Sequence, residues 1–154
     1  PITKERMKLK YIFMFLGVML LGLTACDKKD TLEPSNKNPF AGTKWESTQT
    51  DILNNGDSEI LTHELHFIDD SRLIHILSSK ITAKDGRIID QQNPIIKEEL
   101  TYTHEDSLAT VIFDTVEDGK RTRQKVTLTM DAAKEKITAL AEGETETIIY
   151  TRKK

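Results

Sequence analysis

Alternation of apolar and polar residues with a period of two is the feature that most constrains the fold of this chain. Val126, Leu128 and Met130 alternate with polar residues in the clearest example. Successive side chains of a strand point to opposite faces, so such a run predicts a strand with one buried face. Similar runs cover residues 61–67, 72–77, 99–103, 109–113, 137–141 and 145–151. We therefore expect seven or eight strands in the second part of the chain.

Short turn signals separate these runs at an even spacing. They are Asn-Asn-Gly-Asp at 54–57, Asp-Gly at 85–86, Glu-Asp at 105–106, Glu-Asp-Gly at 117–119 and Glu-Gly at 142–143. Such pairs favour turns, because glycine accepts a positive φ and aspartate bonds its own backbone. Residues 131–135 have a helix-forming composition but are too few for more than a turn.

So many strands must bury one apolar face against something. The even spacing indicates an antiparallel meander rather than alternating strands and helices. We predict an all-β domain over residues 40–154, a small barrel of about eight strands. A two-sheet β-sandwich is the alternative.

A basic segment and an apolar stretch precede this domain. Lys8 and Lys10 come first, and the apolar stretch runs from Tyr11 to Leu23. It is shorter than the roughly 20 residues that a membrane-spanning helix needs, and it is typical of a signal peptide. We expect residues 1–25 to form a signal peptide region with its true start at Met7.

The segment Leu-Thr-Ala-Cys at 23–26 resembles the bacterial lipobox. The resemblance implies cleavage between Ala25 and Cys26, a lipid on the Cys26 thiol and an acylated amino terminus. Cys26 is the only cysteine of the chain, so it cannot form an internal disulfide. Two or three acyl chains would make the attachment stable. The alternative is an ordinary secretory leader with an incidental cysteine.

Residues 26–39 are expected to form the lipidated cysteine and a flexible tether, since they are polar and contain two prolines. Residues 27–30, Asp-Lys-Lys-Asp, resemble surface-export signals of some Gram-negative groups, although Asp27 alone resembles an inner-membrane retention signal of enteric bacteria. A merely solvated spacer is equally compatible with this composition. We expect a lipid-anchored protein of the cell envelope, at the outer membrane, with its periplasmic or surface face left open.

Both ends of the expected barrel resemble lipocalin-like lipoprotein domains. Residues 38–46, Asn-Pro-Phe-Ala-Gly-Thr-Lys-Trp-Glu, are similar to the opening of those domains, and residues 149–152 to their closing strand. In lipocalins a first-strand tryptophan packs under a late arginine, so the resemblance implies a contact between Trp45 and Arg152. Lipocalins place one residue between the glycine and the tryptophan, whereas this chain places two. The resemblance also implies a carrier of a small lipophilic ligand.

The expected barrel interior is lined by apolar side chains of several runs. These are Trp45, Leu65, Phe67, Tyr102, Phe113 and Leu128. An eight-stranded barrel is near the size at which side chains alone fill the interior, so these residues either hold a ligand or form a closed core.

The charge of the chain excludes one class of partner. Residues 26–154 carry 18 basic and 24 acidic groups, a formal charge of −6. Binding of nucleic acid or of anionic headgroups needs a basic face, so neither is expected.

The four histidines predict no metal site or cofactor. His63 and His66 are three apart, which on a strand places them on opposite faces. His75 and His104 belong to other runs. The spacing matches no standard zinc motif, and core-edge or exposed positions account for all four.

The sequence therefore predicts a non-catalytic binding or interaction role. No motif of an activated nucleophile occurs, and a small envelope hydrolase is kept as an alternative. The basic run at 121–125 marks either a face for an envelope protein partner or a solvated strand edge.

Overall fold

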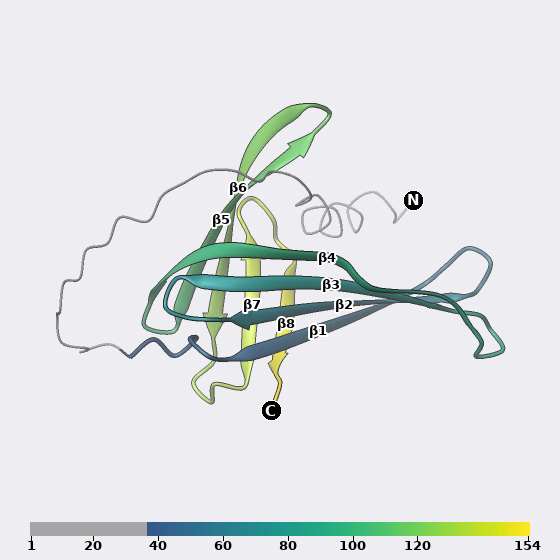
Figure 1. Ribbon diagram of the computed structural model, residues 1–154, viewed down its shortest axis with the longest axis horizontal. Coiled ribbons are helices and arrows are strands. Elements are labelled where there is room, and N and C mark those ends of the chain that lie inside the picture. Colours follow the sequence, from purple (N-terminus) through teal and green to yellow (C-terminus); the bar gives the residue numbers. More distant parts are fainter. Residues whose placement is uncertain (1–36) are drawn as a thin grey trace.

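The computed structural model describes residues 37–154 as a closed barrel of eight antiparallel strands in chain order (Figure 1). The strands are β1 (Lys44–Ile52), β2 (Ser58–Phe67), β3 (Arg72–Thr82), β4 (Ile88–Glu105), β5 (Leu108–Glu117), β6 (Lys120–Met130), β7 (Lys136–Ala141) and β8 (Thr147–Arg152). The all-β meander barrel is confirmed, and the two-sheet alternative is wrong because β8 returns to pair with β1.

The expected turns connect the strands. The β5–β6 hairpin has Asp118 and Gly119 in its turn, with φ values of 51° and 75°. Two successive left-handed residues match the right-handed twist of the flanking strands, which is why Asp-Gly suits this position. Residues 131–135 form a turn between β6 and β7, as predicted.

Two short seams hold the barrel closed. Trp45 pairs with Arg152 and Glu46 with Thr151 between β1 and β8. Lys153 reinforces this seam, because its ammonium lies 2.8 Å from a Glu46 carboxylate oxygen and 2.7 Å from one of Glu64. The β4–β5 seam consists of four residue pairs, from Tyr102–Val111 to Glu105–Leu108.

Beyond these seams the strands continue as projecting hairpins. Figure 1 shows the β1–β2 and β3–β4 hairpins extending to the right of the barrel and the β5–β6 hairpin extending upward. Residues 88–98 of β4 pair with β3 on one side and have no partner on β5. This part of β4 is not predictable from periodicity, because residues 90–94 are polar, contain Pro94 and lack alternation.

The core fills the barrel and is closed by aromatic rings. All six residues predicted to line the interior are buried, with at most 7% of their surface exposed. The Phe67 ring centroid lies 5.2 Å from that of Phe40 and 4.9 Å from that of Tyr102. Phe40 is fully buried, so the segment before β1 packs into the barrel.

Candidate functional site

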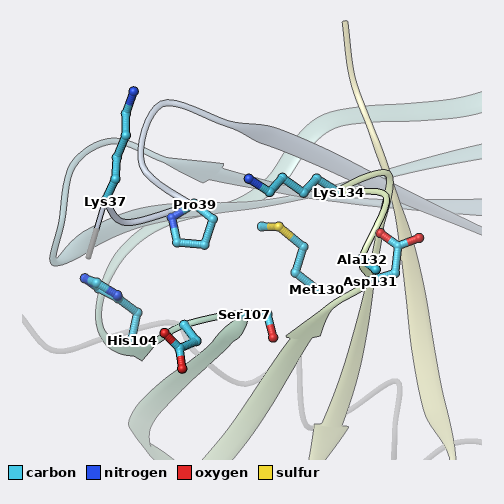
Figure 2. A pocket seen from close by; sticks show the side chains of 9 residues that line it. Lys37, Pro39, His104, Ser107, Met130, Asp131, Ala132 and Lys134 are labelled. Carbon is cyan, nitrogen blue, oxygen red and sulfur yellow. The ribbon is translucent and has the colours of Figure 1, made fainter. Parts of the chain in front are cut away.

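An open pocket of about 250 Å³ lies at one end of the barrel (Figure 2). In an up-and-down meander alternate turns lie at opposite ends, so this pocket is at the end opposite the β5–β6 turn. Three separate segments form it: the chain before β1, the β4–β5 turn and the β6–β7 loop. The lining residues are Lys37, Pro39, His104, Asp106, Ser107, Met130, Asp131, Ala132 and Lys134.

The chain before β1 is fixed by Asn38. The Asn38 Nδ2 group donates to the Tyr102 hydroxyl at 2.8 Å and to Asp70 Oδ1 at 3.3 Å. Its Oδ1 accepts the Phe40 amide at 2.9 Å. The residues on either side of Asn38 are therefore held as one wall of the pocket.

The β6–β7 loop forms the opposite wall. Asp131 Oδ1 accepts the amides of Glu135 and Lys136 at 2.8 and 3.0 Å. These bonds stabilise the carboxylate and lower the pKa of Asp131. The Lys134 carbonyl accepts Arg152 Nη1 at 3.2 Å, which ties the loop to the end of β8.

Charged groups of both signs surround the pocket without partners among the described residues. Neither the Lys37 and Lys134 ammonium groups nor the Asp106 carboxylate has a hydrogen bond or ion pair within residues 37–154. Figure 2 shows the Lys134 and Met130 side chains reaching toward Pro39 across the pocket. Met130 is buried and forms an apolar floor. The arrangement suits a small molecule that carries charge and a short apolar part.

A cluster of three polar side chains, His63, His75 and Glu98, lies inside the barrel. His63 Nδ1 lies 3.3 Å from His75 Nε2, and His75 Nδ1 lies 2.9 Å from Glu98 Oε1. The two rings stack, with centroids 5.6 Å apart, and both histidines are buried. Burial first, and the neighbouring His75 second, lower the pKa of His63 to about 4. The contact with the Glu98 carboxylate orients the His75 ring.

His63 and His66 lie on opposite faces of β2, which confirms the prediction from their spacing. His66 Nε2 lies 2.8 Å from Glu64 Oε2, whereas His63 is buried on the inner face. The contact of His63 with His75 was not predicted. The hairpin turn at 69–71 pairs Leu65 with His75, so His63 is the diagonal neighbour of His75 and within reach of an aromatic ring.

A small cavity lies inside the barrel. A cavity of about 20 Å³ lies among core side chains that include Phe113, Leu128 and Tyr150. This is room for about one water molecule. The Tyr150 hydroxyl is buried and has no hydrogen-bond partner within residues 37–154, and burial raises its pKa.

Ala25 and Cys26 lie outside the described residues. Arg121 to Lys125 lie on the part of β6 that pairs with β5 and not with β7. Between residues 37 and 154 no helix is long and apolar enough to cross a membrane. In the same part of the chain no three His, Cys, Asp or Glu side chains are arranged to hold a metal ion.

Comparison with known proteins found no matching family model, no matching curated protein and no matching solved structure.

Proposed function

We propose that this chain is a lipid-anchored protein of the bacterial cell envelope, attached at the outer membrane through Cys26. We propose further that its barrel is a non-catalytic binding module. The leader, the lipobox-like residues 23–26 and the polar tether support the anchor. The pocket at the end of the barrel supports the binding role.

The observation that carries the binding role is the contrast between two volumes. The pocket has about 250 Å³ and is lined by Lys37, Lys134 and Asp106, whose charged groups have no partner within residues 37–154, whereas the interior cavity has about 20 Å³. Sites for small molecules usually measure roughly 300–1,000 Å³. The volume of the pocket approaches this range and that of the 20 Å³ cavity does not, so binding at the pocket is favoured.

A carrier of a small lipophilic ligand is the second candidate. The buried Tyr150 hydroxyl, which has no hydrogen-bond partner within residues 37–154, favours it, because a ligand with one polar atom would satisfy that group. Native mass spectrometry of the purified protein tests this candidate. A co-purified apolar molecule supports the carrier, and its absence after gentle extraction argues against it.

Metabolic labelling with an alkyne analogue of palmitate tests the anchor. We expect label on the wild-type chain and none on Cys26→Ser. Labelling of the Cys26→Ser chain would refute the assignment.

Photo-crosslinking tests the binding role in the intact envelope. A crosslinker is placed at Lys134 in the pocket and, as a matched control, at Lys120 on the exposed β5–β6 turn. We expect reproducible products at position 134 that are missing at position 120. Equal products at both positions would argue against binding through the pocket.

A further inference from the structure

The charges of the pocket have a particular chemistry. Lys37 and Lys134 supply ammonium groups, and Asp106 supplies a carboxylate, none with a partner among the described residues. The Asp131 carboxylate is different, because its Oδ1 is already bonded to two backbone amides. An anionic ligand would satisfy the lysines and leave Asp106 unpaired. A zwitterion would pair its negative group with the lysines and its positive group with Asp106.

The rest of the lining limits the size and polarity of such a ligand. Pro39 in one wall and the buried Met130 in the floor supply apolar surface, and Ser107 adds a small polar side chain. A volume of about 250 Å³ is small for a whole lipid or a peptide. It fits a charged headgroup with the first carbons of its apolar body.

The position of the pocket along the chain indicates where such a group would come from. Lys37, which lines the pocket, is eleven residues after Cys26. Eleven residues reach at most roughly 40 Å when fully extended. With the proposed lipid on Cys26, the pocket is therefore held within reach of a surface made of headgroups. Tethering raises their effective concentration at the pocket into the millimolar range or above.

The charge of the domain selects among headgroups. Residues 26–154 carry a formal charge of −6, so an anionic surface would repel the domain. A zwitterionic headgroup carries no net charge and avoids this cost. Its phosphate suits the lysines, and its ammonium suits Asp106.

We propose that the pocket binds the phosphoethanolamine headgroup of membrane lipids, through Lys134, whose ammonium points across the pocket in Figure 2, on the phosphate and Asp106 on the ammonium. This inference rests on the proposed lipid anchor. It gives the barrel a second, specific contact with the membrane that carries it.

The test uses the full chain, purified in a non-ionic detergent and titrated with soluble short-chain lipids. Intact mass first reports whether Cys26 carries lipid, so a failed anchor is recognised separately from a failed pocket. The probes are dihexanoyl phosphatidylethanolamine, dihexanoyl phosphatidylglycerol and free phosphoethanolamine. Binding is followed by NMR shifts of the amides that line the pocket.

We expect phosphatidylethanolamine to bind more tightly than phosphatidylglycerol. Lys134→Gln should weaken the binding of phosphatidylethanolamine roughly tenfold, because one charge-assisted hydrogen bond is lost. Asp106→Asn should weaken the binding of phosphatidylethanolamine but not the binding of phosphatidylglycerol, because phosphatidylglycerol lacks the ammonium group.

Matched controls separate these effects from changes in folding. Asp118→Asn is the control for Asp106→Asn, because both aspartates lie in turns with φ near 50°. Lys120→Gln is the control for Lys134→Gln and lies at the opposite end of the barrel. Both controls should bind within twofold of the wild type. Equal binding of wild type and Lys134→Gln would overturn the proposal. If free phosphoethanolamine binds as tightly as the lipid, the claim that the ligand is a membrane lipid would be refuted.

Discussion

The guanidinium carbon of Arg152 lies 5.7 Å from the centroid of the Trp45 ring, across the seam where β8 pairs with β1. Trp45 is fully buried, and its Nε1 donates to Thr43 Oγ1 at 2.7 Å. Arg152 Nη1 also donates to the Lys134 carbonyl. The Arg152 side chain therefore covers the buried Trp45 ring and binds the β6–β7 loop, and its backbone belongs to the seam between β8 and β1. The contact implied by the lipocalin resemblance is confirmed, despite the extra residue between Gly42 and Trp45.

Removing this side chain should loosen the barrel. We expect Arg152→Ala to lower the free energy of unfolding by about 1–2 kcal/mol, through loss of the cation–π contact and of packing on the ring. Urea unfolding followed by the fluorescence of Trp45, the sole tryptophan, measures the effect. Arg123→Ala on the exposed part of β6 is the control. An unchanged midpoint for Arg152→Ala would show that the contact adds nothing to stability.

The parts of the fold that could be predicted are those where one face is buried. Val126, Leu128 and Met130 alternate because they line the closed part of the barrel, and all three are buried. Residues 88–94 of β4 lie in a projecting hairpin where both faces are exposed to solvent. No burial demands alternation there, so a polar run with Pro94 forms a strand that periodicity cannot reveal.

The pocket could not be predicted for a different reason. Its walls come from residues 37–39, 104–107 and 130–134, which are far apart in the sequence. Each segment has only the composition of a turn or linker. The meander alone places two of these turns at the same end, and the packing of Phe40 adds the third segment.

The conformation of the β6–β7 loop should depend on the hydrogen bonds that Asp131 accepts. We expect Asp131→Ala to speed amide hydrogen exchange at Glu135 and Lys136, because both amides lose their acceptor. The bonds lower the pKa of this carboxyl, so its stabilising effect is complete above the ordinary aspartate pKa and is lost as the pH falls through the lowered value. Asp90→Ala, on the exposed part of β4, is the control. Exchange at these two amides that matches the wild type would contradict the role of Asp131.

The buried His63 should make stability depend on pH. Its pKa is about 4 in the folded chain, against roughly 6.5 when unfolded. Between these values the unfolded chain binds more protons, so stability rises with pH. The stability that comes from the lowered pKa of His63 is fully present above about pH 7 and is lost as the pH falls toward 4. We expect a loss of about 2 kcal/mol between pH 7 and pH 5 from this residue alone.

Two variants assign this dependence to its source. His63→Gln should remove most of the slope between pH 7 and pH 5 in urea unfolding, whereas His104→Gln, at the pocket, should retain it. His75 on β3 and Glu98 on β4 form the rest of the group with His63. If His63→Gln keeps the slope of the wild type, the dependence arises elsewhere.

Tyr102 and Tyr150, the two buried tyrosines within residues 37–154, should respond in opposite ways to substitution by phenylalanine. The Tyr150 hydroxyl has no partner within residues 37–154, so its desolvation is not repaid. The Tyr102 hydroxyl donates to the Asp69 carbonyl and accepts the Asn38 amide. We expect Tyr150→Phe to leave stability unchanged or raise it by about 1 kcal/mol, and Tyr102→Phe to lower it by about 1–2 kcal/mol.

Chemical unfolding of both variants under one condition checks this pair. Tyr102→Phe also serves as a control for the loss of a hydroxyl without a change of ring size. A clear loss of stability in Tyr150→Phe would mean that its hydroxyl holds a water or a ligand in the 20 Å³ cavity that it lines. That result would favour the carrier over the pocket as the binding site, because a polar partner inside the barrel is what a ligand in the interior requires.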